Sequence, residues 1–90
     1  MKPQNFYFTF GSWKGFPFQN GYIIVQALNK SDAIATFRQY HPDVHENTVN
    51  CSFVYTEQEW QKSNNSYDEN RMFDILFSTT KEMEEEALER

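Results

Sequence analysis

This chain of 90 residues carries a net charge of −5, is 18% aromatic and contains a single cysteine, Cys51. Its length fits one domain, no stretch approaches the roughly 20 apolar residues of a membrane span, and one cysteine excludes an internal disulfide. The acidic balance predicts that the protein does not bind DNA directly. The N-terminus lacks the layout of a signal peptide, so we expect a cytoplasmic protein.

Two strands are predicted in the first third of the chain. Residues 5–10 alternate and place three phenylalanines on one face, which is typical of a strand with one buried side. Residues 22–28 form a continuous, β-branched run that indicates a second strand. We expect the two strands to pair as a hairpin, joined by a long loop from Gly11 to Gly21 that glycine, proline and asparagine punctuate.

A helix, a third strand and a second helix are predicted next. Ser31 is expected to cap a helix with one apolar face that Pro42 ends. Residues 51–55 alternate and indicate the third strand. Thr56 and Glu59 have the spacing of a capping box, which predicts a short helix through residue 62.

The last part of the chain is more ambiguous. Residues 71–77 fit a strand face and also fit the start of a longer helix, and we favour a fourth strand. Residues 81–90 are rich in helix formers but poor in apolar anchors, so we expect a single domain over residues 1–80 and an acidic helical or frayed tail over residues 81–90. Residues 1–42 have a net charge of +3 and residues 43–90 a net charge of −8.

The predicted order β-β-α-β-α-β favours the α+β class. We expect a three- to four-stranded, mostly antiparallel sheet with one or two helices on one face.

The loop between the two first strands is the predicted binding site. Its glycines allow backbone amides to point at a ligand, an exposed tryptophan offers a stacking face, and a lysine offers a charge. This arrangement suits either a hot spot for a protein partner or a nucleotide. The alternative is that Phe16 and Phe18 only fill the core. The predicted site residues are Gly11, Trp13, Lys14, Gly15, Phe16, Gln19 and Asn20.

Catalytic and metal sites find little support in the sequence. His41, His45 and Cys51 have the spacing of an incomplete zinc site, because a structural site needs four ligands. Nothing around Cys51 would lower the pKa of its thiol, and no catalytic motif is present, so we expect no cofactor, no metal and no enzyme activity. The acidic run of the tail is typical of a solvated face, with mimicry of a nucleic-acid backbone as the alternative.

Three segments of the chain resemble a group of small proteins encoded by phages and prophages of Gram-positive bacteria. These segments are FYFTFGS at residues 6–12, FPFQNGY at residues 16–22 and TVNCSFVYTEQEW at residues 48–60. The resemblance covers residues 5–62, and it implies no particular functional residue.

The resemblance implies a setting in which small acidic proteins inhibit host defence. Such proteins include anti-CRISPR proteins, which bind a nuclease complex, and sponges, which bind a signalling nucleotide. We therefore expect an inhibitor that binds a host protein or protein–nucleic-acid complex stoichiometrically in the bacterial cytoplasm. The alternative is an oligomeric sponge that sequesters a nucleotide, and a homo-oligomer is compatible with either function.

Overall fold

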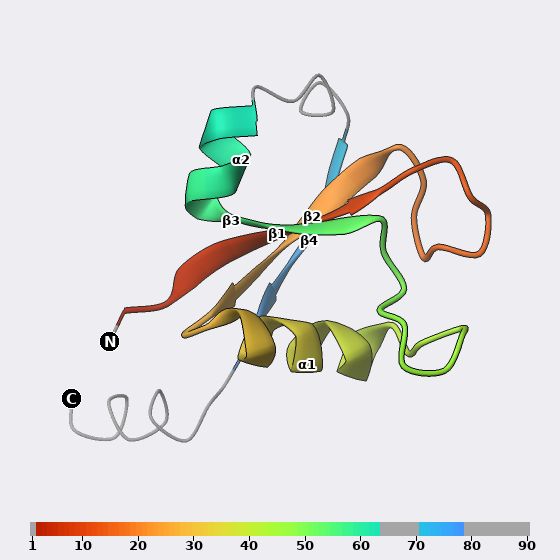
Figure 1. The fold of residues 1–90 in the computed structure, drawn as a ribbon, viewed down its shortest axis with the longest axis horizontal. Helices are drawn as coiled ribbons and strands as arrows, with labels where there is room; N and C mark the ends of the chain where they lie inside the picture. The colour runs from red at the N-terminus through yellow and green to blue at the C-terminus, as the bar shows by residue number, and fades with distance from the viewer. Residues whose placement is uncertain (1, 64–70, 79–90) are drawn as a thin grey trace.

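The computed structural model describes residues 2–63 and 71–78 of the chain. The α+β class and the predicted element order are confirmed, including the strand at residues 71–77 (Figure 1). The elements are β1 (Gln4–Phe10), β2 (Gly21–Ala27), α1 (Lys30–Tyr40), β3 (Phe53–Thr56), α2 (Glu57–Ser63) and β4 (Arg71–Phe77). The predicted acidic tail at residues 81–90, and the domain boundary before it, lie outside the described residues.

The four strands form one mixed sheet in the order β3-β1-β2-β4. The predicted hairpin of β1 and β2 is its centre, and β3 pairs antiparallel with the free edge of β1. Strand β4 pairs parallel with β2, with an irregularity in register between Tyr22 and Ile24. The sheet is therefore mostly antiparallel, as predicted, with one parallel pair at an edge.

The core lies between α1 and one face of the sheet. Phe6, Phe8 and Phe10 point to this face from β1, as their alternation predicted, and all three are buried. The ring of Phe37 on α1 stacks on Phe8 with 4.6 Å between centroids. Ile23 and Val25 of β2 complete the buried centre.

Helix α2 lies on the opposite face of the sheet from α1 (Figure 1). Tyr7 precedes Phe8 in the strand and so points the other way, and its ring stacks on Trp60 of α2 at 4.5 Å and 3°. The Tyr7 hydroxyl donates to both carboxylate oxygens of Glu57, at 3.1 and 3.0 Å. Burial, together with this carboxylate, raises the pKa of Tyr7 to about 12. The α2 helix is thus held on the sheet by ring contacts of Trp60 and by hydrogen bonds to the Glu57 carboxylate.

The starts of the two helices test the predicted caps. The capping box is confirmed, because the Glu59 amide donates to Thr56 Oγ1 at 3.1 Å and the Thr56 amide donates to Glu59 Oε1 at 2.9 Å. The cap of α1 was predicted wrongly, since Asn29 rather than Ser31 accepts the Asp32 amide, at 2.8 Å. Asparagine and serine are equally good caps. Because β2 ends at Ala27, the helix begins at Lys30, and Asn29 is then the residue directly before its first turn.

The third strand begins two residues later than predicted. The Ser52 amide still reaches the sheet and donates to the Thr9 carbonyl at 2.8 Å. The Cys51 amide turns back to the Val49 carbonyl at 2.8 Å, so the chain bends at this point and Cys51 lies outside β3.

Candidate functional site

The loop between β1 and β2 is folded on itself by its own hydrogen bonds. The Asn20 amide donates to the Gly11 carbonyl at 3.0 Å and closes the base of the loop, with Asn20 in the left-handed region at φ 57°. The Gln19 side-chain amide donates to the carbonyls of Phe16 and Trp13, at 2.9 and 3.3 Å. These bonds fix the loop without a ligand.

Trp13 stands at the surface of this loop with 46% of its area exposed. Its ring meets the ring of Phe16 edge-on at 5.0 Å and lies beside the His45 imidazole at 5.9 Å and 23°. A side chain on Gly15 would overlap the Trp13 ring, so glycine at this position lets the ring lie against the backbone. The exposed ring is therefore positioned by contacts on three sides.

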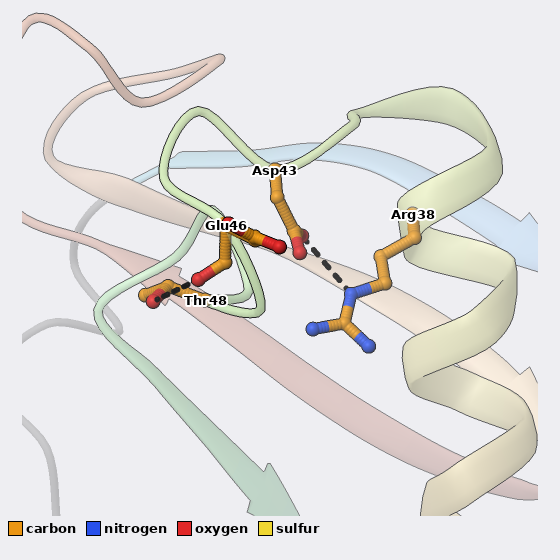
Figure 2. A network of polar contacts seen from close by, with 4 residues as sticks. All are labelled: Arg38, Asp43, Glu46 and Thr48. Atoms are coloured by element: carbon orange, nitrogen blue, oxygen red, sulfur yellow. Dashed lines mark hydrogen bonds and ion pairs between the residues drawn. The ribbon is translucent and has the colours of Figure 1, made fainter.

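The chain between α1 and β3 forms a second fixed loop beside Trp13. Arg38 of α1 donates from Nε to Asp43 at 3.0 Å and anchors the start of this loop (Figure 2). Further along, the Thr48 amide donates to the His45 carbonyl at 3.0 Å, around Asn47 at φ 61°. This turn presents His45 to Trp13.

The two loops enclose an open cleft of about 440 Å³. Asn50 links them, because its side-chain amide donates to the Gly15 carbonyl at 3.3 Å. The cleft is lined by Trp13, Phe16, Val44, His45, Thr48, Val49, Asn50, Cys51 and Ser52.

The chemistry of this cleft is apolar and nearly uncharged. Its lining contains one histidine, His45, and neither lysine, arginine nor an acidic residue. Burial raises the pKa of the Cys51 thiol to about 12, so the thiol stays protonated and is a poor nucleophile. In the described part of the chain every fully buried side-chain nitrogen and oxygen has a hydrogen-bond partner.

Some of the predicted site residues line the cleft, and others stabilise the loop instead. Trp13 and Phe16 line the cleft, and Lys14 is exposed on the same loop. Hydrogen bonds within the loop involve Gly11, Gln19 and Asn20, so these residues stabilise its conformation. Gly15 accommodates the Trp13 ring, and neither Gly11 nor Gly15 has a positive φ.

Phe18 fills the core rather than the site, as the alternative interpretation predicted. Its ring stacks on Phe73 of β4 at 4.7 Å and meets Phe10 at 5.7 Å. It also contacts the ring of His41 at 5.5 Å. Burial lowers the pKa of His41, against the opposing charge of Asp74, so this histidine serves as a packed, neutral ring.

The three residues with the spacing of an incomplete zinc site lie in different places. His45 and Cys51 line the cleft, whereas His41 packs on Phe18 and Phe37. Among residues 2–63 and 71–78 no group of three or more histidine, cysteine or acidic side chains is placed to hold a metal ion.

The sequence analysis missed the second wall of the cleft and an aromatic cluster under α2. Val44, His45 and Thr48 follow no periodic pattern, so the sequence carried no signal for that wall. The aromatic cluster had a signal, because tyrosines occupy the strand positions between buried residues. Trp60 meets Tyr7, Tyr22 and Tyr55 there at 4.5, 4.9 and 5.6 Å.

Comparisons with protein families, with curated proteins and with solved structures give no match to this chain. In the part of the chain that the structure describes, neither helix is long and apolar enough to cross a membrane.

Proposed function

We propose that this chain is a binding protein that inhibits a host protein by stoichiometric occupation through the Trp13 cleft. The observation that carries the proposal is the half-exposed Trp13 ring, held against Gly15, Phe16 and His45 at the mouth of an apolar cleft. Tryptophan is among the residues most enriched at interface hot spots, where it is packed against a partner and closed off from water.

The rigidity of the two loops supports this use of Trp13. A side chain that is already ordered loses little further conformational entropy when a partner binds, so more of its contact energy appears as affinity. The hydrogen bonds of Gln19 within one loop and the ion pair of Arg38 and Asp43 in the other supply that order.

The role as an inhibitor rests on the resemblance to phage and prophage proteins, and so does the bacterial cytoplasm as the place of action. A non-catalytic function agrees with the state of the cleft. Its cysteine is held as a neutral thiol, and its buried polar groups are already paired.

The nucleotide sponge is the second candidate, and the cleft supports it less well. A bound phosphate needs basic side chains or free backbone amides. No lysine or arginine lines the cleft, and the amides of Phe16 and Asn20 already donate within their loop. Lys14 remains as an exposed charge on that loop.

A comparison of three forms of the protein tests the proposal. The wild type, Trp13→Ala with Lys14→Ala, and Tyr40→Ala are immobilised and exposed to lysate of a Gram-positive host. Tyr40 is a matched control because it is also an exposed aromatic residue but lies on α1, outside the cleft lining. The captured protein is then purified and titrated against each form.

The expected result is a partner that binds the wild type and the Tyr40 variant equally. Its affinity for the double variant should be at least about tenfold weaker, or about 1.4 kcal/mol. Equal binding to all three forms would show that the cleft is not the site. A rise in melting temperature with micromolar nucleotide and no protein partner would favour the sponge.

A further inference from the structure

Strand β3 has one side that no other strand occupies. It stands first in the sheet order β3-β1-β2-β4, so β1 pairs with one of its sides and the other side is free. Figure 1 shows β3 in front of the other strands, with α1 below the sheet and α2 above it. A free edge presents backbone amides and carbonyls, which can pair with the backbone of another extended chain.

The hydrogen bonds of the sheet show which backbone groups of β3 face this free edge. The Thr9 carbonyl of β1 accepts the Ser52 amide at 2.8 Å, so the backbone groups of Thr9 point toward β3. Phe53 stands opposite Thr9, and its carbonyl accepts the Thr9 hydroxyl at 3.3 Å, so Phe53 points back toward β1. Backbone groups alternate sides along a strand. Val54 therefore turns both its amide and its carbonyl to the free edge.

The start of α2 closes one end of the edge and leaves Val54 open. Thr56 also faces outward, two residues after Val54, and its amide donates to Glu59 Oε1 at 2.9 Å. Within residues 2–63 and 71–78, the amide and carbonyl of Val54 have no hydrogen-bond partner on this side. The edge thus offers one residue whose donor and acceptor are both available to another backbone.

The two edges of the sheet differ in how they are protected. At β4 the Ser78 amide donates to the Gln26 carbonyl at 2.9 Å, so by alternation the Ile75 amide faces the free side. The Asp74 carboxylate accepts this amide at 2.8 Å. Charged residues and prolines hinder the addition of a strand to an edge, and residues 47–56, which lead into β3 and form it, contain neither. The β3 edge is therefore the one suited to pairing.

The free edge of β3 leads into the Trp13 cleft. Asn50, Cys51 and Ser52 line the cleft and directly precede β3 in the chain. With a rise of about 3.3 Å per residue, Ser52 lies roughly 7 Å from Val54 along the strand. An extended segment that pairs with Val54 reaches the cleft within two or so of its own residues.

We propose that the β3 edge accepts an extended segment of the protein partner as an additional strand, and that this segment places an apolar side chain in the Trp13 cleft. The inference rests on the proposed function and names how the partner is recognised. Paired backbone groups select an extended chain, because a helix has already used its own amides and carbonyls. The cleft then selects the side chain, since its lining carries neither lysine, arginine nor an acidic residue.

Chemical ligation of the full chain allows the Val54 amide alone to be altered. A synthetic peptide of residues 51–90 begins with Cys51 and can be joined to a thioester of residues 1–50. Nα-methylation of Val54 removes the outward amide hydrogen and blocks the approach of a strand. Nα-methylation of Phe77 is the matched control, because its amide faces the free side of β4. Circular dichroism melting checks folding, and an ester in place of the Val54 amide carries the test if the methylated chain is not folded.

Short linear peptides displayed on phage serve as the probe. They are selected on the ligated wild type, synthesised, and titrated against each form of the chain and against Trp13→Ala. The selected peptides should bind the wild type and the Phe77-methylated form equally. Their affinity for the Val54-methylated form and for Trp13→Ala should be at least about tenfold weaker.

The outcomes separate this inference from the proposed function. Peptides that bind the Val54-methylated form as tightly as the wild type, or a selection that yields no peptide, overturn the strand pairing. Peptides weakened only by Trp13→Ala leave the cleft as the site and refute the strand pairing alone, whereas peptides weakened only by methylation of Val54 support the strand pairing and refute the cleft. A wild type that dimerises in sedimentation, with a monomeric Val54-methylated form, would show that the edge pairs with a second copy and would also overturn the inference.

Discussion

Gly15 and Gly21 offer a paired test of how the structure uses its glycines. A methyl group on Gly15 would overlap the far end of the Trp13 side chain. A methyl group on Gly21 would overlap the Arg71 carbonyl oxygen and the Phe73 ring. The first obstacle is a half-exposed side chain that can move, and the second includes the backbone of β4. We therefore expect Gly15→Ala to be tolerated and Gly21→Ala to be severely destabilising.

The expected change in the free energy of unfolding depends on which group each alanine displaces. At Gly15 the backbone has no positive φ, so alanine fits it and lowers the entropy of the unfolded chain, a gain of about 0.4–1 kcal/mol. The displaced Trp13 ring loses its edge contact with Phe16, worth about 0.5–1.5 kcal/mol. These terms nearly cancel, so the free energy of unfolding should change by less than about 1 kcal/mol. At Gly21 the pairing of β2 with β4 must open, at a cost of about 3 kcal/mol.

Urea unfolding followed by circular dichroism gives both free energies, and the indole N–H signal of Trp13 in an NMR spectrum reports its position. Gly15→Ala should shift that signal and leave the unfolding midpoint almost unchanged. A loss of more than about 2 kcal/mol in Gly15→Ala would show that Trp13 is part of the core. If Gly15→Ala and Gly21→Ala were equally stable, a clash with the backbone of β4 would cost no more than a clash with the Trp13 side chain, and the reasoning would be refuted.

Three further predictions concern single side chains. Trp60→Ala should lower the free energy of unfolding by about 2 kcal/mol or more, measured by urea unfolding, because the stack on Tyr7 is the main anchor of α2; an unchanged midpoint would contradict this. The Thr56 amide holds the pKa of Glu59 below its usual range, so Glu59 stabilises the fold above its usual pKa of about 4.3, and this contribution disappears as the pH falls through the lowered value. Melting curves should show the wild type and Glu59→Gln converging at acid pH, and a constant difference would count against the hydrogen bond. Cys51, with a pKa of about 12, should react slowly with a thiol reagent at neutral pH and quickly in urea; rapid native labelling would show that the thiol is neither buried nor inert.

Local patterns predicted the elements of this fold well because their causes are local. The phenylalanines of β1 alternate with a period of two, and Thr56 and Glu59 form a capping box within one turn. The side of the sheet that α2 occupies was not predictable in this way. It depends on Trp60 meeting Tyr7, a contact between residues more than fifty positions apart.

The candidate site was predicted only in part for the same reason. The exposure of Trp13 and the inward position of Phe18 followed from where they stand between glycines and prolines. The opposite wall of the cleft depends on the ion pair of Arg38 with Asp43 and on the amide of Asn50, and both join segments that no periodic pattern connects. The parallel pairing of β4 was equally hidden, because alternation identifies a strand but not its neighbour.

The central position of the hairpin also determines the order in which the chain can fold. Strands β1 and β2 are adjacent in the sequence and are followed directly by α1, so their contacts close smaller loops than those of β3 and β4 and form early. Strand β4 must return across more than forty residues to pair with β2, which is a slow step. Substitutions on β1 should therefore slow refolding, whereas substitutions on β4 should mainly accelerate unfolding. Strand β3 also pairs with β1 across more than forty residues, so protection of amides from hydrogen exchange should fall from the central hairpin toward both edges of the sheet.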